Sequence, residues 1–227
     1  MRALFAVALA MTFGCHTTPT SPTQEAETPP MPQSGTQTTT QAAMGHVGVD
    51  PGHATNRGTA LTPTGNDKLA AFAAGCFWGV EDAFRHVPGV VATAAGYSGG
   101  HLANPTYEDV SSHTTGHAET VLVEFDPTKV SYDKLLVAFF AIHDPTQGNR
   151  QGPDFGDNYR SVVFTFDDTQ KATAEAAKQK EQGILSRPVT TSIEPMHAFY
   201  KAEDYHQQYS ERTGDHSCPI RARLETL

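Results

Sequence analysis

The composition of the chain changes sharply near Asp67, and this change limits how much of the chain can fold. Residues 16–66 are dominated by Thr, Pro, Ser, Gln and Gly, and large apolar side chains are almost absent from them. Such a segment cannot bury enough apolar surface to offset the entropy that is lost on ordering. We therefore expect residues 16–66 to form a disordered linker and residues 67–227 to form one folded domain.

Residues 1–15 have the features of an export signal. Arg2 supplies a positive charge, and residues 3–13 are apolar except for one threonine. This run is too short to span a bilayer, which takes about 20 residues, but it suits a secretory signal. Cys15 follows a glycine, as in the lipid-attachment box of bacterial lipoproteins, and this pattern predicts lipidation of that cysteine.

A second processing site competes with lipidation. Ala8-Leu9-Ala10 fits the small-residue cleavage pattern of a secretory signal, and cleavage there would leave Cys15 without a lipid. Both alternatives predict an exported protein. It would be either a cell-envelope lipoprotein held at the membrane through Cys15 or a periplasmic protein.

The net charge and the cysteine count exclude several classes of protein. The formal net charge is -9 and no basic cluster is present, which argues against nucleic-acid binding. The three cysteines, Cys15, Cys76 and Cys218, include no C-x-x-C pair. Their spacing excludes a disulfide-dense scaffold, a four-cysteine zinc site and a thioredoxin-type motif.

The strongest chemical signal is the stretch Gly75-Cys76-Phe77-Trp78. It follows an apolar run and precedes apolar residues at helical spacing, which predicts a strand, a glycine turn and a helix beginning at about Cys76. A thiol in the first turn of a helix loses its proton readily, because unpaired amides and the helix dipole stabilise the thiolate. Trp78, the only tryptophan, suits an apolar substrate pocket beside that thiol. The alternative is a buried cysteine that acts only as a small apolar side chain.

Glu119 begins a clear strand that runs to Phe125. Its position has the same parity as Val121 and Val123, so its carboxyl group is expected on their apolar face. Desolvation there would raise the carboxyl pKa and keep a proton available for general acid catalysis. Leu122 lies on the other face, so periodicity alone leaves open a glutamate in solvent at the edge of the strand.

The order of the predicted elements is β-α-β-β-α-β followed by additions. This order predicts an α+β fold of the split β-α-β (ferredoxin-like) kind, a two-layer sandwich with a mixed or antiparallel sheet and an extra C-terminal segment. The predicted strands cover residues 68–73, 90–97, 119–125, 161–166 and 190–194. The predicted helices cover residues 76–86, a segment capped by Ser131, residues 168–184 and residues 202–211.

Three alternative interpretations have weaker support in the sequence. His113 and His117 have helical ligand spacing near Glu119, but their segment is rich in Ser, Thr and Gly and lacks H-E-x-x-H, so zinc is disfavoured. A hydrolase or transferase using Cys76 with a histidine is supported only by the number of histidines. A surface lipoprotein that binds methionine-rich partners without turnover is the third alternative.

The ordered set of short motifs resembles the A class of peptide methionine sulfoxide reductases. The resemblance begins at Gly75-Cys76-Phe77-Trp78 and covers about residues 69–218, nearly the whole predicted domain. It does not extend to the B class, which is marked by different motifs and often by zinc-binding C-x-x-C pairs. The further matching blocks are residues 95–100, 104–107, 115–119, 143–147, 151–154, 159–161 and 206–209.

The resemblance implies a role for each matching residue in the chemistry. Cys76, as a thiolate, would attack the sulfur of a methionine S-sulfoxide, and Glu119 would protonate the sulfoxide oxygen. Tyr107 and Tyr159 would donate hydrogen bonds to that oxygen. Cys76 would remain as a sulfenic acid, the reversible stage of cysteine oxidation.

The resemblance also implies the residues that bind substrate. Phe77 and Trp78 would line the pocket for the S-methyl group. Asp154 would orient the methionine backbone or a water molecule, and His206 would support the site. No metal and no cofactor is implied.

Regeneration is implied to use Cys218. It would condense with the sulfenic acid of Cys76 to a disulfide, which a thioredoxin or a thioredoxin-like reductant would open. Cys218 follows Asp215-His216-Ser217, where family members commonly have Gly-Tyr. A static Cys76–Cys218 bridge formed during export is the alternative. The partners implied are therefore oxidised proteins, peptides or free methionine sulfoxide and the reductant, with the enzyme acting as a monomer.

Overall fold

The computed structural model describes residues 61, 63 and 65–218. The predicted export signal, with Cys15, and residues 16–60 of the predicted linker lie outside these residues. Leu61 is buried against the sheet, so packed structure begins before Asp67. Within the described part of the chain, no helix is long and apolar enough to cross a membrane.

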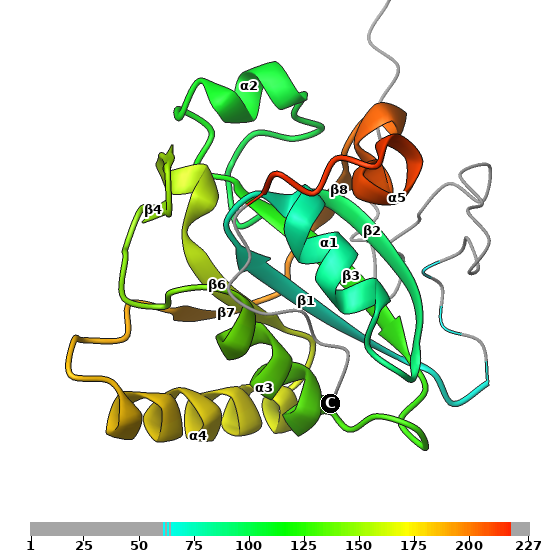
Figure 1. Cartoon of the computed structure of the whole chain (residues 1–227), viewed down its shortest axis with the longest axis vertical. Helices are drawn as coiled ribbons and strands as arrows, with labels where there is room; N and C mark the ends of the chain where they lie inside the picture. Colours follow the sequence, from blue (N-terminus) through cyan, green and yellow to red (C-terminus); the bar gives the residue numbers. More distant parts are fainter. Residues whose placement is uncertain (1–60, 62, 64, 219–227) are drawn as a thin grey trace, which may run out of the picture. The chain divides into compact units, whose positions relative to one another are not determined.

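One six-stranded sheet forms the centre of the fold (Figure 1). Its strand order is β7-β6-β1-β3-β2-β8. All neighbours are antiparallel except β6 and β7, which are parallel, so the sheet is mixed. The strands are β1 (Lys68–Ala74), β2 (Val90–Ser98), β3 (Ala118–Phe125), β6 (Ser161–Thr165), β7 (Ser192–Pro195) and β8 (Phe199–Lys201). A separate hairpin pairs β4 (Arg150–Gln151) with β5 (Asp154–Phe155).

The predicted split β-α-β arrangement is confirmed. Strands β1 and β2 are both antiparallel to β3, so they run parallel to each other with β3 between them. Helix α1 (Phe77–Arg85) makes the crossover from β1 to β2. A sheet of this kind with packed helices belongs to the predicted α+β class.

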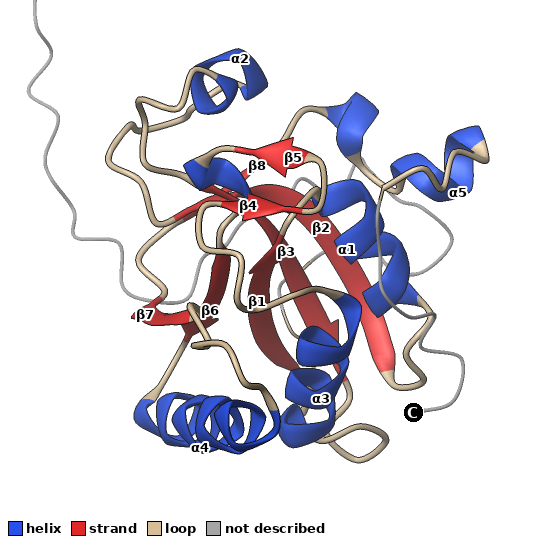
Figure 2. Ribbon diagram, turned by 60° about the vertical axis from the view of Figure 1, so that its left-hand side comes forward, coloured by secondary structure: helices blue, strands red, loops and turns tan. Residues whose placement is uncertain are grey.

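The helices cover one face of the sheet. Figure 2 shows α1 and α3 (Tyr132–Ile142) on the same side, with α4 (Asp168–Ile184) beside α3. Phe72 of β1 lies at the centre of this core, with ring centroids 4.8 Å from Phe84 of α1 and 5.4 Å from Phe139 of α3. Because side chains alternate along a strand, Val121 and Val123 of β3 face the same core.

The other face of the sheet carries a smaller core made largely of alanines. At Gly96 of β2, an added Cβ would collide with the backbone oxygen of Tyr200 in β8, so this close pairing requires glycine. The buried members of this core are Leu61, Ala71, Ala73, Ala92, Ala94, Ala118, Leu122, Val162 and Phe164.

The helix predicted over residues 202–211 is wrong. The chain instead forms a 3-10 turn, η3 (Asp204–His206), then a left-handed residue, Gln208 with φ 46°, and then the short helix α5 (Tyr209–Thr213). The reason is tertiary: Gln207 bonds through its side chain to the backbone N–H and C=O of Ala95 in β2. These bonds hold the segment in a shape that its own helical periodicity does not indicate.

The long connection between β2 and β3 contains a short helix that is not among the helices predicted from the sequence. Helix α2 (Tyr107–Ser111) is capped by Thr106, whose hydroxyl accepts a hydrogen bond from the N–H of Asp109. The carboxylate of Asp109 in turn accepts from the N–H of Thr106, which completes a capping box. This cap fixes the position of Tyr107.

Candidate active site

Cys76 lies between the end of β1 and the start of α1. Gly75 makes the turn with φ 99°, and a Cβ there would collide with the side chain of Gln151, so the turn requires glycine. Cys76 occupies the N-cap position, and its carbonyl accepts the first helical bond from Val80. The predicted strand, glycine turn and helix are all present, with the thiol at the positive end of the helix dipole.

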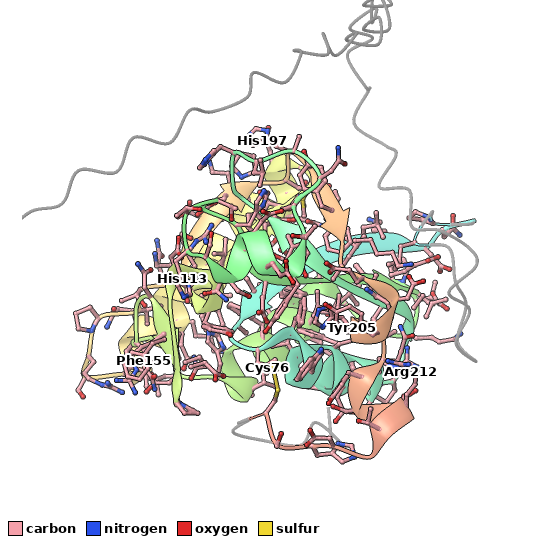
Figure 3. The ribbon with its side chains drawn as sticks, turned by 90° about the horizontal axis from the view of Figure 1, so that it is seen from above. Cys76, His113, Phe155, His197, Tyr205 and Arg212 are labelled. Carbon is pink, nitrogen blue, oxygen red and sulfur yellow. A yellow bond between two sulfur atoms is a disulfide. The ribbon has the colours of Figure 1, made fainter. Side chains whose placement is uncertain are left out.

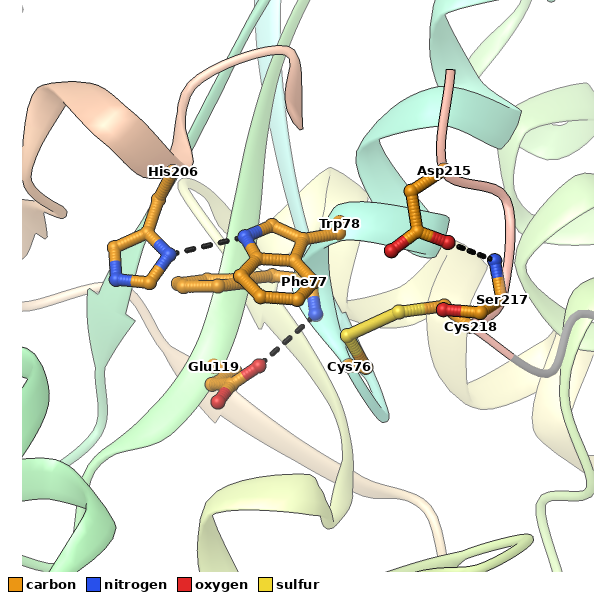
Figure 4. Close-up of a disulfide and its surroundings, with 8 residues drawn as sticks. All are labelled: Cys76, Phe77, Trp78, Glu119, His206, Asp215, Ser217 and Cys218. Carbon is orange, nitrogen blue, oxygen red and sulfur yellow. Dashed lines mark hydrogen bonds between the residues drawn. A yellow bond between two sulfur atoms is a disulfide. The ribbon is translucent and has the colours of Figure 1, made fainter. Parts of the chain in front are cut away.

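Cys76 and Cys218 form a disulfide. Their Cα atoms are 6.3 Å apart, within the usual range for such a bond, although 142 positions separate them in the sequence. Figure 4 shows this bond beside the aromatic side chains of Phe77 and Trp78. The structure therefore describes the oxidised form of the thiol pair.

A pocket of about 280 Å³ opens at the disulfide. In Figure 3 Cys76 lies near the middle of the view, with Phe155 on one side and Tyr205 on the other. The pocket has an aromatic wall, two carboxyl groups and two tyrosines, so it suits a small ligand with an apolar and a polar end. Its lining residues are Cys76, Phe77, Trp78, Tyr107, Glu119, Pro153, Asp154, Tyr159, Ser217 and Cys218.

Glu119 is buried at the inner end of this pocket, with 2% of its surface exposed. Its Oε2 accepts a hydrogen bond of 3.0 Å from the N–H of Phe77, the residue after Cys76. Burial, with a smaller contribution from the charge of nearby Asp154, raises the pKa of Glu119 to about 8, against the lowering effect of the Phe77 N–H and Asn158. The carboxyl group therefore keeps its proton at neutral pH, in a place next to the thiol.

Two tyrosines and a second acidic residue, Asp154, also line this pocket. Tyr107 comes from the first residue of α2, and Tyr159 from the end of the 3-10 turn η2 (Asp157–Tyr159). Burial raises the pKa of Tyr159, so its hydroxyl stays protonated and remains a hydrogen-bond donor. Partial burial also raises the pKa of Asp154.

Trp78 is held from behind by the C-terminal segment. Its indole N–H donates to Nδ1 of His206 at 3.0 Å, and its ring stacks on Tyr209 with 3.8 Å between centroids (Figure 4 shows the hydrogen bond). An indole N–H only donates, so Nδ1 of His206 must be the unprotonated nitrogen. Burial lowers the pKa of His206 to about 4, which keeps this acceptor available across the neutral range.

The family model for peptide methionine sulfoxide reductase matches residues 68–226. The chain belongs to this family. The peptide methionine sulfoxide reductase MsrA of Methanosarcina acetivorans is 59% identical over 147 residues, which cover 64% of this chain and 78% of that protein. MsrA of Geobacter sulfurreducens is 56% identical over 151 residues, covering 66% of this chain and 93% of that protein.

Solved structures agree with this assignment to the methionine sulfoxide reductases. The reduced form of Mxr1 from Saccharomyces cerevisiae has a TM-score of 0.66 at 34% identity, covering 69% of this chain and 93% of that one. Methionine sulfoxide reductase A of Corynebacterium diphtheriae has a TM-score of 0.63 at 36% identity, covering 71% and 82%. Both the resemblance stated from the motifs and the α+β class are thereby confirmed.

In this reductase the fold brings eight of the nine predicted site residues of the domain to one pocket. The exception is His206, which is not part of the lining and contacts the back of Trp78 instead. Nδ1 of His206 accepts the hydrogen bond from the indole N–H of Trp78, which disfavours a catalytic pair between His206 and Cys76. The eight are Cys76, Phe77, Trp78, Tyr107, Glu119, Asp154, Tyr159 and Cys218.

Sequence reasoning missed several residues that shape the reductase site. Glu203 accepts from the N–H of Tyr107 at 2.9 Å and from the hydroxyl of Tyr97 at 3.0 Å, so it fixes the start of α2. Asn158 lies close enough to Glu119 to lower its pKa. Tyr209 belongs to a family motif, but nothing in the sequence pairs it with Trp78.

The histidines considered for zinc do not converge. His117 receives the N–H of Gly100 on Nδ1 and contacts the carbonyl of Leu102 through Nε2. Nδ1 of His113 lies 3.5 Å from Oδ1 of Asp157. Among residues 61, 63 and 65–218 no group of three or more His, Cys, Asp or Glu side chains is arranged to hold a metal ion.

The pKa of Glu119 predicts how stability depends on pH. Its folded value of about 8 lies above its ordinary value of 4.5, so its stabilising contribution is full below pH 4.5 and is lost as pH rises through 8. Glu119→Gln removes this loss, which is at most about 1.4 kcal/mol per pH unit. Urea unfolding of the reduced protein at pH 5 to 8 should show the variant gaining stability over the wild type as pH rises.

Asp126→Asn is the matched control. Hydrogen bonds from Thr128 lower the pKa of Asp126 to about 2, so its contribution changes only in acid, below its ordinary value of 3.8. That variant should follow the wild-type slope between pH 5 and 8. An equal difference between Glu119→Gln and wild type at pH 5 and pH 8 would show that Glu119 is ionised in the folded state.

Proposed function

We propose a role for each pocket residue in the reaction of this chain, which reduces methionine S-sulfoxide both in proteins and in the free amino acid. The chain is an oxidoreductase of the peptide-methionine (S)-S-oxide reductase class. One observation carries the proposal: the buried Glu119 accepts a hydrogen bond from the amide next to Cys76, and Cys76 is paired with Cys218 at the same pocket. A proton donor, a nucleophilic thiol and a second thiol therefore share one site.

The pocket matches the two ends of a methionine sulfoxide side chain. The rings of Phe77 and Trp78 form the apolar wall for the S-methyl group. The hydroxyls of Tyr107 and Tyr159 donate to the sulfoxide oxygen, and Asp154 at the pocket edge faces the backbone of the substrate. His206 acts through Trp78 and does not contact the ligand.

The reductase step moves one oxygen atom and two electrons. The thiolate of Cys76 attacks the sulfoxide sulfur, and Glu119 gives its proton to the oxygen. The attack forms an S–S bond between Cys76 and the substrate. The S–O bond of the substrate then breaks, the hydroxyl passes to the Cys76 sulfur, and the S–S bond breaks with its electron pair left on the methionine sulfur. Methionine is thereby reduced by two electrons and Cys76 is oxidised by two, to a sulfenic acid. A neutral carboxyl group is the form that this step requires, and the burial of Glu119 supplies it.

Regeneration uses the bond between Cys76 and Cys218. The thiol of Cys218 displaces the sulfenic hydroxyl as water, and the resulting disulfide is the form described by the structure. A thioredoxin-like dithiol then reduces it by thiol–disulfide exchange, through a mixed disulfide. The exposure of the segment that carries Cys218 supports access for such a protein: His216 and Ser217 are both exposed.

An assay with separate sulfoxide epimers tests the function. With dithiothreitol as reductant, the wild type should consume a methionine S-sulfoxide peptide and leave the R epimer, and Cys76→Ser should consume neither. In single turnover Glu119→Gln should be slower by at least roughly a hundredfold, the lower figure for general acid catalysis. Turnover by Cys76→Ser, or equal use of both epimers, would contradict the proposal.

The role of Cys218 is tested by its serine variant. With thioredoxin as reductant, Cys218→Ser should form one equivalent of methionine and then stall, because the thiol that condenses with the sulfenic acid at the pocket has been removed. With dithiothreitol, a small thiol that reaches the sulfenic acid directly, the same variant should turn over continuously. Continuous turnover with thioredoxin would instead assign the disulfide a static role.

We also propose that the protein is exported and carries a lipid on Cys15. The support is the apolar run of residues 3–13 and the glycine before Cys15. Cells that express the full chain and are fed labelled palmitate should yield a labelled protein in the membrane fraction, and Cys15→Ser should abolish the label. An unlabelled, soluble product whose mass matches cleavage after Ala10 would contradict lipidation.

A further inference from the structure

Helix α1 carries a buried carboxylate that the proposed reaction does not use. Glu81 has 0% of its surface exposed. It accepts three hydrogen bonds: from the hydroxyl of Thr93 at 2.9 Å, from the backbone N–H of Gln208 at 2.8 Å and from the side-chain amide of Gln208 at 3.0 Å. Two of these three donors belong to a single residue of the C-terminal segment.

A buried cation lies beside this carboxylate. Arg85, one turn further along α1, donates to Thr93 at 3.3 Å and forms a bidentate pair with Glu211 at 2.9 and 2.7 Å. Burial raises the pKa of Glu81 to about 7, while the bonds from Gln208 and Thr93 and the charge of Arg85 oppose that rise. The network therefore joins α1 and β2 to the segment that contains Gln208.

Gln208 lies between the two residues that hold Trp78. His206 accepts the indole N–H and Tyr209 stacks on the indole ring. Gln208 itself has a left-handed backbone with φ 46°, a conformation that costs free energy for a residue other than glycine. The bonds to Glu81 compensate for this cost and fix the direction in which the chain turns from His206 to Tyr209.

The contacts form a closed loop on one side of α1. Trp78 and Glu81 are three positions apart, so they lie on the same side of the helix. From Glu81 the contacts pass to Gln208, then along the chain to Tyr209, and from there back to Trp78. One turn of α1 thus carries both the pocket wall and the group that anchors the segment behind that wall.

We propose that Glu81 is a positioning residue for substrate binding, which holds Gln208 in its turn and thereby fixes the Trp78 indole as the apolar wall of the methyl pocket. This inference rests on the proposed function, because Trp78 is the wall of that pocket. The competing explanation is that Gln207 alone anchors the segment, through its bonds to Ala95 of β2.

Glu81→Gln separates these explanations. The amide keeps the size of the side chain but presents its own N–H₂ to the donors of Gln208, so at least one of those bonds is lost. Trp78 is the only tryptophan of the chain, so fluorescence reports its surroundings alone. In the reduced variant the emission should move to longer wavelength and acrylamide should quench it more strongly than in the wild type.

The kinetic effect should be confined to binding. A wall that contacts the methyl group equally in the ground state and the transition state contributes to KM and leaves kcat unchanged. We expect KM for a methionine S-sulfoxide peptide to rise roughly two- to tenfold, which is the range for losing one well-placed aromatic contact. The value of kcat should stay near that of the wild type.

Two further proteins control for a loss of stability alone. Gln170→Ala removes a buried side chain of α4 that bonds Leu69 and Phe166, so it should lower stability and leave both the emission and KM unchanged. The exchange Glu81→Gln with Gln208→Glu places an amide donor opposite a carboxylate again, and it should restore both readouts toward wild type.

The proposal is overturned if Glu81→Gln keeps the wild-type emission, quenching and KM, which would assign the anchoring to Gln207. Should Glu81→Gln fail to fold, Gln208→Gly gives the same two readouts, because glycine accepts the left-handed turn but loses the side-chain bond to Glu81. Failure of the proposed function is a different result: the wild type would not consume the S epimer, while the fluorescence comparison would still stand.

Discussion

The hydrogen bond from the Phe77 N–H to the Glu119 carboxyl group is the interaction on which the site depends. It joins the first amide of α1 to the central strand β3 at 3.0 Å, directly beside Cys76. A charged carboxylate would be favoured by that amide but disfavoured by burial, and burial dominates, since the pKa is raised to about 8. The result is an acid that is both fixed in place and protonated.

The split β-α-β topology explains how this contact arises. β1 and β3 are adjacent, and α1 starts where β1 ends, so a residue at the start of β3 comes close to the N-terminus of α1. Tyr97 of β2 is the direct cross-strand neighbour of Glu119 and closes the space on its other side. The fold therefore buries the carboxyl group of Glu119 at one end of the sheet, between β2, β3 and the start of α1.

The sequence predicts the side of the site formed by Cys76 and Glu119 better than the side formed by the C-terminal segment. Parity along β3 places Glu119 with Val121 and Val123, and the apolar run before Gly75 predicts the turn that carries Cys76, because both depend on local periodicity. In residues 202–211 the local helical periodicity does not determine the structure. Gln207 and Gln208 bond to β2 and α1, and such long-range hydrogen bonds leave no periodic pattern in the sequence, so the predicted helix over residues 202–211 failed.

The C-terminal segment has two tasks that place opposite demands on it. Its first part must keep Trp78 in place, and buried bonds to Ala95 and Glu81 hold it there. Its last part carries Cys218, whose disulfide with Cys76 lies at the pocket and must open before Cys76 can act as the nucleophile of the proposed reaction. After Gly214, with φ 74°, the contacts with α1 include the exposed pair of His216 and Asp82 at 3.2 Å, and exposed pairs of this kind contribute little stability. Buried contacts thus hold the part of the segment behind Trp78, whereas the contact of His216 near Cys218 is exposed and weak.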